Sequence, residues 1–258
     1  MAISTIENLV VIGAKGNMGA LFVERAKVAG IKVHTLDKPL DMDVVEHILP
    51  RTDAVILSIP VTAFSQVLDT IVPHLGEDTI LTDVCSVKEI PLNAMLKAYD
   101  GPVVGTHPLF GPVIPEDLPP RVAVTPGRND EAATAISALM RRLGFQPFTT
   151  TVENHDKAMA YVQGLNFTTT VAYLSAMREV DDIEKFMTPS LKRRLESARK
   201  MVTADKELFA LITGSNPYLQ ETIRVFKNYL SVAAGGDLDL LANRAGWWWR
   251  NDQTKGRV

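Results

Sequence analysis

The sequence predicts an α/β protein in which a doubly wound parallel sheet is followed by an all-helical C-terminal domain. Up to about residue 150, short apolar runs alternate with amphipathic segments, which is the pattern of parallel strands joined by crossover helices. From about Val152 onward, long helix-compatible stretches follow with almost no strand signal. We therefore expect two domains, covering residues 1–151 and 152–258, with their boundary near residue 151.

The apolar runs of the first half are the expected strands, and the amphipathic segments between them are the expected helices. The strands are predicted at residues 9–12, 32–36, 54–59, 79–83, 102–105, 121–124 and 146–149. The helices are predicted at residues 17–29, 42–49, 63–72 and 130–143. Ligands of doubly wound sheets bind beyond the carboxyl ends of the strands, so the residues that follow each strand are the candidate site residues.

In the second half, the pairs Thr188-Pro189 and Asn216-Pro217 indicate helix starts or breaks. Four or five helices in a segment of this length cannot easily bury their apolar faces by themselves. We therefore expect a homodimer that packs through the helical domain.

Composition narrows the class of protein. The chain has 27 basic and 30 acidic residues and a formal net charge of −3, which is unlike a nucleic-acid-binding protein. No apolar run reaches the ~18 residues of a membrane span, and the N-terminal residues do not resemble an export signal. The single cysteine, Cys85, cannot form an internal disulfide. We expect a cytoplasmic protein without nucleic-acid or membrane partners.

A glycine motif follows the first strand and opens the first helix. Gly13, Gly16 and Gly19 form a G-x-x-G-x-x-G pattern, in which Lys15 stands where the common G-x-G-x-x-G motif has its second glycine. Backbone N–H groups and the helix dipole at this point favour a pyrophosphate, with Asn17 and Met18 beside it. A tight strand-to-helix turn without a ligand would give the same pattern. We predict a Rossmann-type dinucleotide-binding domain.

Asp37 ends the second strand, roughly 20 residues past the glycines, where a carboxylate can accept hydrogen bonds from the adenosine ribose. This position favours NAD, and the neighbouring Lys38 leaves NADP possible. Ser58 and Pro60 end the third strand and are expected to line the cofactor. The alternative for Asp37, Ser58 and Pro60 is an ordinary turn.

Two segments that follow neighbouring strands, residues 83–88 and 105–112, are expected to meet at one edge of the sheet. His107 can accept a proton from an alcohol as its carbon gives up a hydride, and Ser86 can orient that hydroxyl or the imidazole. A structural histidine in a Pro/Gly-rich loop is the alternative. Lys88 is expected to be a solvated residue that opens the next helix, with a cofactor or substrate contact as the alternative. Cys85 is expected to pack in the sheet because no base lies near it in sequence, with a nucleophile as the alternative.

Three motifs of the chain resemble, in order, signatures of the prephenate/arogenate dehydrogenase family. They are S-V-K at residues 86–88, H-P-x-F-G-P at 107–112, and E-N-H-D followed by Met159-Ala160 at 153–160. The resemblance spans Val10 to about Asp205 and is close to the dehydrogenase portion of enteric bifunctional chorismate mutase/prephenate dehydrogenases. It implies NAD-dependent oxidative decarboxylation of prephenate to 4-hydroxyphenylpyruvate in tyrosine biosynthesis, with His107 and Ser86 acting on the ring hydroxyl.

The same resemblance points to substrate-binding residues in the helical half. Lys200, with Arg199 beside it, falls where related enzymes carry a substrate-binding arginine, although such a run is also typical of a solvated helix face. Gln163 and Asn166 follow His155 at helical spacing and are expected to face the pocket. His155-Asp156 can alternatively be a helix start with its capping partner. No metal site is predicted. Trp247, Trp248 and Trp249 are assigned packing in the core or at a contact between subunits, and no catalytic role.

Two departures from the family pattern affect substrate selection. Phe167 replaces a polar histidine, and Val113 replaces an acidic residue that often follows the His-Pro motif. Arogenate or another cyclohexadienyl acid therefore remains an alternative substrate. A related hydroxyacid or imine oxidoreductase and a non-catalytic NAD-sensing protein are the alternative functions.

Overall fold

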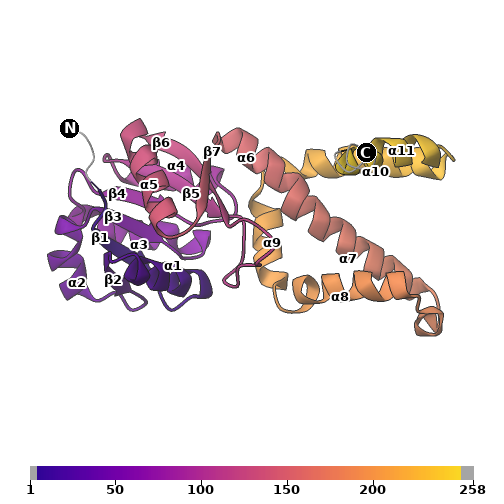
Figure 1. Cartoon of the computed structure of the whole chain (residues 1–258), viewed down its shortest axis with the longest axis horizontal. Helices are drawn as coiled ribbons and strands as arrows, with labels where there is room; N and C mark the ends of the chain where they lie inside the picture. Colours follow the sequence, from indigo (N-terminus) through magenta and orange to yellow (C-terminus); the bar gives the residue numbers. More distant parts are fainter. Residues whose placement is uncertain (1–4, 251–258) are drawn as a thin grey trace, which may run out of the picture. The chain divides into compact units, whose positions relative to one another are not determined.

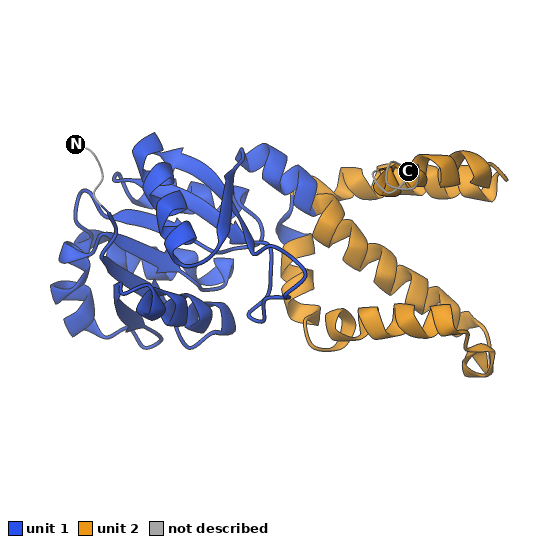
Figure 2. Cartoon of the chain, viewed as in Figure 1, with its two compact units in different colours: residues 1–159, 214–216 blue, residues 160–213, 217–258 orange. Residues whose placement is uncertain are grey.

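The computed structural model describes residues 5–250, which fall into two compact units. Unit 1 contains the residues up to 159 together with 214–216, and unit 2 contains 160–213 and the residues from 217 onward (Figure 2). The outer ends of the two expected domains, residues 1–4 and 251–258, lie outside the described residues.

Unit 1 is built on a seven-stranded sheet with the order β2-β1-β3-β4-β5-β6-β7 (Figure 1). Strands β1 to β5 are parallel, β6 is antiparallel to β5, and β7 is parallel to β6. The chain order reverses on the two sides of β1, which makes the crevice between the carboxyl ends of β1 and β3 the topological switch point. The strands are β1 (Asn8–Ile12), β2 (Lys32–Leu36), β3 (Ala54–Leu57), β4 (Ile80–Asp83), β5 (Val103–Pro108), β6 (Arg121–Arg128) and β7 (Gln146–Thr149).

Helices cover both faces of this sheet, so the predicted doubly wound α/β fold is confirmed. One apolar core lies under α1 (Asn17–Val28) and α5 (Asp130–Arg142), and it includes Phe22 and Ile136. The other core lies under α2 (Met42–His47), α3 (Phe64–Ile71) and α4 (Glu89–Ala98). Every residue of β3 and β4 is buried, as expected for central parallel strands that are covered on two sides. Short 3-10 turns join these elements at η1 (Leu49–Arg51), η2 (Val61–Ala63) and η3 (Val72–His74).

Three strand ends differ from the sequence prediction, and one of them is that of the sixth strand, which runs to Arg128 rather than ending at residue 124. The third strand ends at Leu57 rather than residue 59, because Ser58 to Pro60 lead into η2. The fifth strand continues to Pro108 rather than ending at residue 105, because β6 pairs with it along its whole length, with His107 opposite Ala123. His107 therefore lies inside a strand, where the backbone of a neighbouring strand fixes its position.

The structure also moves the expected domain boundary. Helix α6 (Val152–Met159) belongs to unit 1, whereas residue 151 was the expected end of the first domain. Its residues His155, Asp156 and Met159 are buried. The sequence pattern changes from strand to helix at residue 152, but α6 packs on the sheet unit through these side chains.

Unit 2 is all-helical, as predicted for the second half of the chain. It begins with a π-helical segment, η4 (Ala160–Leu165), and α8 begins at Pro189 with the Thr188 hydroxyl accepting a hydrogen bond from the Leu191 N–H at 3.2 Å. Phe167 stacks on Phe209 with 5.1 Å between ring centroids. The remaining elements are α7 (Asn166–Ala176), η5 (Met177–Glu179), η6 (Ile183–Phe186), α8 (Pro189–Thr203), α9 (Lys206–Ser215), α10 (Leu219–Ala234), α11 (Leu238–Ala245) and η7 (Gly246–Trp249).

No helix within residues 5–250 is both long enough and apolar enough to cross a membrane.

Candidate active site

The glycine motif forms a tight loop at the switch point. Gly13 adopts φ 86°, and a Cβ atom there would lie 2.3 Å from the Ser58 carbonyl oxygen. A Cβ at Gly19 would lie 2.1 Å from the Gly13 carbonyl oxygen, so only glycine allows helix α1 to pack this closely on the loop. The loop is tied to β2 through the Gly13 N–H, which donates to the Leu36 carbonyl at 2.8 Å.

The amino end of α1 is open for an anion. Gly16 is the N-cap and has no side chain to accept hydrogen bonds from the first turn. The N–H groups of Asn17, Met18 and Gly19 therefore have no acceptor within the helix, and the helix dipole favours negative charge there. This arrangement fits a dinucleotide pyrophosphate, as the motif predicts.

Asp37 lies beside this loop at the end of β2. Its Oδ1 accepts a hydrogen bond from the Lys15 N–H at 2.9 Å, which holds the carboxylate at the crevice. Lys38, which leaves a phosphorylated ribose possible, donates from Nζ to Gln66 Oε1 at 2.9 Å. Ser58 and Pro60 follow β3 on the other side of the crevice, where the Ser58 N–H donates to the Ile12 carbonyl. The residues predicted to bind the cofactor thus gather at one switch point.

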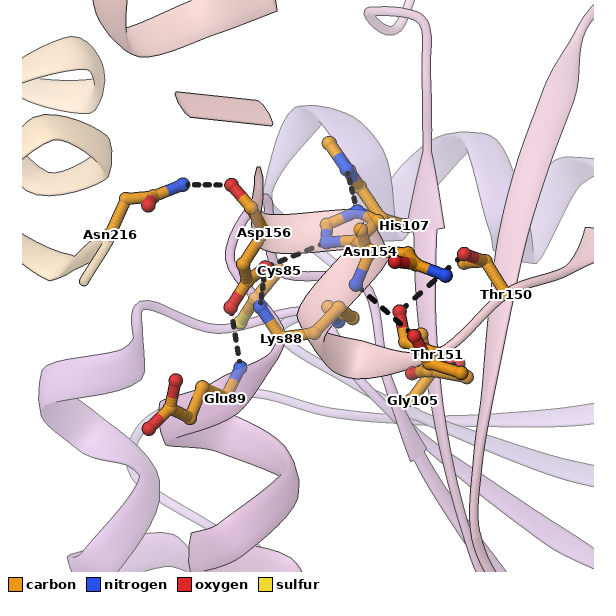
Figure 3. Close-up of polar contacts among 12 residues, drawn as sticks. Cys85, Lys88, Glu89, Gly105, His107, Thr150, Thr151, Asn154, Asp156 and Asn216 are labelled. Atoms are coloured by element: carbon orange, nitrogen blue, oxygen red, sulfur yellow. Dashed lines mark hydrogen bonds and ion pairs between the residues drawn. The ribbon is translucent and has the colours of Figure 1, made fainter. Parts of the chain in front are cut away.

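His107 is the buried titratable group at the carboxyl end of β5, with 3% of its surface exposed. Its Nδ1 lies 2.9 Å from Nε2 of His155, which projects from α6. His155 Nδ1 in turn lies 2.7 Å from Asp156 Oδ1. Figure 3 shows His107 and Asp156 in one connected set of polar contacts. The first imidazole is therefore supported by a second imidazole and a carboxylate.

Asp156 also caps a helix that is distant in sequence. Its Oδ1 accepts from the Lys88 N–H at 2.8 Å and its Oδ2 from the Glu89 N–H at 2.9 Å, at the start of α4. The Asn216 amide donates to the Asp156 carbonyl at 2.8 Å (Figure 3). The capping role considered for this segment thus exists, but the capped helix is α4 rather than α6.

Lys88 is fully buried, so the expectation of a solvated residue is wrong. Its Nζ forms an ion pair with Asp83 Oδ2 and donates to the Thr106 carbonyl at 2.5 Å. Asp83 also accepts a hydrogen bond from the Cys85 N–H at 2.8 Å. The lysine begins α4 as predicted, but its side chain turns into the space between β4 and β5 because a buried carboxylate is there to pair with it.

Ser86 and Cys85 lie in the loop between β4 and α4. Ser86 is half-buried, and within residues 5–250 no hydrogen bond joins its hydroxyl to another residue. Burial raises the pKa of the Cys85 thiol, and the Asp83 carboxylate raises it further. A thiol that resists ionisation is a poor nucleophile, which agrees with the packing role predicted for Cys85.

Comparison with known proteins finds similarity to one family. Residues 24–116 match the family model of the prephenate dehydrogenase nucleotide-binding domain. The T-protein of Enterobacter agglomerans is 33% identical over 225 residues, which cover 86% of this chain and 59% of that protein. Both matches support the prephenate/arogenate dehydrogenase family for this chain.

Other relatives are more distant in sequence. A probable arogenate/prephenate dehydrogenase of Methanocaldococcus jannaschii is 27% identical over 240 residues, covering 84% of this chain and 54% of that protein. The fold is also that of a prephenate dehydrogenase from Aquifex aeolicus solved with hydroxyphenyl propionate and NAD⁺, with a TM-score of 0.77, 18% identity and 98% coverage of both chains. This chain spans only 54% to 59% of the length of these two curated relatives.

The residues predicted to bind the substrate lie in unit 2. Gln163 is part of the π-helical segment η4, and its Oε1 is buried without a hydrogen-bond partner within residues 5–250. Asn166 is exposed at the start of α7. Arg199 and Lys200 are exposed on α8, where Lys200 Nζ lies 3.8 Å from an Asp205 carboxylate oxygen.

The side chains of Trp247, Trp248 and Trp249 are more than half exposed in η7. They do not pack in an apolar core of this chain, so the core-packing role considered for them is wrong. The role at a contact between subunits remains a prediction.

The sequence reasoning did not assign a role in the chemistry to His155, Asp156, Asp83 or Lys88. The E-N-H-D motif gave a signal for the first two, because a histidine and a carboxylate stand next to each other in a segment shared with the family. The S-V-K motif includes Lys88, but nothing in that motif shows that the side chain is buried, since its partner Asp83 lies in the preceding strand.

The protonation of His107 gives a testable pH dependence of stability. Burial, the neighbouring His155 and the positive charge of Lys88 lower the pKa of His107 well below its usual value of 6.5. The unfolded chain therefore binds a proton at this residue below about pH 6.5 while the folded protein does not. Because protons then favour the unfolded state, the free energy of unfolding should fall as the pH drops below about 6.5.

Urea unfolding between about pH 5 and pH 7.5 measures this effect, with the non-titrating His107→Asn variant as the reference. Relative to that variant, the wild-type protein should lose up to about 1.4 kcal/mol per pH unit in the acidic range. Parallel stability curves for the two proteins would contradict a neutral His107 in the folded state.

Proposed function

We propose that this protein is a prephenate dehydrogenase, which catalyses NAD-dependent oxidative decarboxylation of prephenate to 4-hydroxyphenylpyruvate. The observation that carries the proposal is His107, a buried imidazole at the carboxyl edge of the sheet whose Nδ1 is engaged by His155. Its Nε2 is not engaged by His155 and can therefore accept a hydrogen bond from a substrate hydroxyl. The family match supports the substrate class, and the open glycine loop supports the cofactor.

The chain's own residues would handle the proton. His107 Nε2 accepts the hydrogen bond and then the proton of the ring 4-hydroxyl, and Ser86 holds that hydroxyl in place. When bound, NAD supplies the hydride acceptor for the same carbon. Loss of the ring carboxylate as carbon dioxide leaves its bonding electrons in the ring, and the phenolate oxygen takes back the proton from His107. The products are 4-hydroxyphenylpyruvate, carbon dioxide and NADH, so atoms and charges balance.

The substrate carboxylates are proposed to bind Arg199 or Lys200, with Gln163 and Asn166 contributing amide hydrogen bonds. The buried and unpartnered Oε1 of Gln163 supports its part, because such an atom is costly unless something pairs with it. Lys200 is available because its ion pair with Asp205 is long and its own side chain is 75% exposed, and such a pair is weak.

A homodimer that packs through the helical unit, in the cytoplasm, belongs to the same proposal. Unit 2 exposes large apolar side chains that a partner could cover, among them Phe186, Leu230, Leu238, Leu240 and Trp248. Sedimentation equilibrium of the full chain tests this assembly, since a protomer of 28.3 kDa should then sediment with twice that mass.

Arogenate dehydrogenase is the second candidate activity. The Methanocaldococcus jannaschii relative carries both substrate names, and two positions that depart from the family pattern bear on selection. Val113 is exposed in the loop after β5, and the ring of Phe167 is stacked on Phe209.

Initial rates with purified protein distinguish these activities. NAD or NADP is combined with prephenate or arogenate, and the absorbance of the reduced nicotinamide is followed. Rapid NAD reduction with prephenate is the expected result. A preference for arogenate would select the second candidate, and NAD binding without turnover of either substrate would favour an imine reductase or a sensor.

Asp37→Ala should change cofactor selectivity. The carboxylate of Asp37 is fixed by Lys15, and one of its oxygens is left to accept hydrogen bonds from the ribose hydroxyls and to repel a ribose phosphate. We expect NAD affinity to fall by about tenfold and the NAD/NADP ratio of kcat/KM to fall with it, since a hydrogen bond to a charged group contributes about 1.5–3 kcal/mol. An unchanged ratio in parallel NAD and NADP titrations would refute the assigned ribose contact.

A further inference from the structure

We propose that His155 and Asp156 are positioning residues that fix the tautomer of His107, so that His107 Nε2 meets the substrate as a bare acceptor. The catalytic consequence rests on the proposed function. The tautomer itself is a property of the protein without substrate. All three residues lie in unit 1, on β5 and α6.

The Asp156 carboxylate determines which atoms donate in the hydrogen bonds that join it to His155 and His107. Both Asp156 oxygens accept backbone N–H groups, from Lys88 at 2.8 Å and from Glu89 at 2.9 Å. These donors stand at the amino end of α4, where the helix dipole favours an ionised carboxylate. An ionised carboxylate has only acceptors, so His155 Nδ1, which lies 2.7 Å from Oδ1, must carry the proton.

The position of the proton on His155 in turn determines which nitrogen of His107 carries a proton. When His155 is neutral, its proton on Nδ1 leaves a lone pair on Nε2. That lone pair faces His107 Nδ1 at 2.9 Å, so His107 must donate from Nδ1 and keep its own lone pair on Nε2. The opposite tautomer of His107 would place two lone pairs face to face in a buried site, which is unfavourable because neither nitrogen would have a donor.

The charged groups around the pair agree with a neutral His107. The buried Lys88 cation lies between β4 and β5 and is paired with Asp83. On α6, the exposed Glu153 and Lys157 pair with each other at 2.5 Å. Burial, the neighbouring His155 and the Lys88 charge all lower the pKa of His107, which keeps its lone pair available near neutral pH. A carboxylate orients the catalytic histidine of serine proteases in a related way, whereas here a second imidazole stands between the two groups.

The test compares two substitutions at one position. In His155→Gln, the amide oxygen can occupy the place of Nε2 and accept from His107 Nδ1. In His155→Leu, a side chain of suitable size fills the space without an acceptor. Nitrogen-15 NMR of histidine-labelled protein reports the tautomer, and the spectrum of His107→Asn identifies the His107 signals. Thermal unfolding of each variant shows whether it is folded under the conditions of the spectrum.

The expected spectra show His107 protonated on Nδ1 in the wild type and in His155→Gln, and shifted toward the Nε2-protonated form in His155→Leu. We expect kcat to fall about 10- to 100-fold in His155→Leu and only a few-fold in His155→Gln, with little change in the KM for NAD. An Nε2-protonated His107 in the wild type overturns the proposal, and this spectrum needs no variant to fold.

Equal losses of kcat in the two variants with an unchanged His107 tautomer would also overturn the proposal, because they would indicate a structural role. If the wild-type protein turns over neither prephenate nor arogenate, the proposed function has failed, and the NMR spectra still decide the tautomer. The two failures are therefore distinguishable.

Discussion

Replacing His107 with asparagine is expected to lower kcat by about 10²- to 10⁴-fold, the range for loss of a general base. The asparagine amide can still donate to His155 Nε2 from the position of the imidazole Nδ1, so the buried contact is kept. It has no basic nitrogen at the position of Nε2. The cofactor loop at Gly13 to Gly19 is not touched, so the dissociation constant of NAD should stay within about twofold.

Steady-state kinetics with prephenate and a fluorescence titration with NADH measure the two parts of this result. His74→Asn is a matched control. His74 lies in η3 before the amino end of β4, whereas His107 lies near the carboxyl end of β5, which is parallel to β4. The kcat of His74→Asn should equal that of the wild type. Wild-type turnover in His107→Asn would remove His107 from the mechanism.

Replacing Lys88 with methionine is expected to lower the free energy of unfolding by about 3–5 kcal/mol, the usual cost of removing one partner of a buried ion pair. Methionine has a similar volume, so the change leaves little cavity. It leaves the Asp83 carboxylate, whose side chain is 0% exposed, without its cation and removes the hydrogen bond to the Thr106 carbonyl. Urea unfolding monitored by circular dichroism measures the loss.

Two controls separate this charge effect from a general effect of substitution. Lys192→Met removes a cation from an exposed pair with Glu196 on α8, and stability should change by less than about 0.5 kcal/mol. Combining Lys88→Met with Asp83→Asn removes the unpaired charge while keeping an acceptor oxygen, so part of the stability should return. A single Lys88→Met variant as stable as the Lys192→Met control would contradict the buried pair.

The sequence by itself determined the α/β class, the helical second half, the glycine loop and the candidate His107. Each of these depends on local information. Strand and helix periodicity appears within a few residues, and the need for glycine at Gly13 and Gly19 comes from one turn. The family motifs added the expected chemistry for His107, which position in a strand alone would not supply.

Only the tertiary structure decided what surrounds His107. Its contact to His155 joins residues 48 apart, and the cap from Asp156 to Lys88 joins residues 68 apart, so neither has a spacing that a sequence pattern reveals. The burial of Lys88 and the assignment of α6 to the sheet unit also depend on tertiary contacts that no local sequence pattern reveals. The physical reason is that a polar side chain can be buried only where distant parts of the chain bring a partner to it.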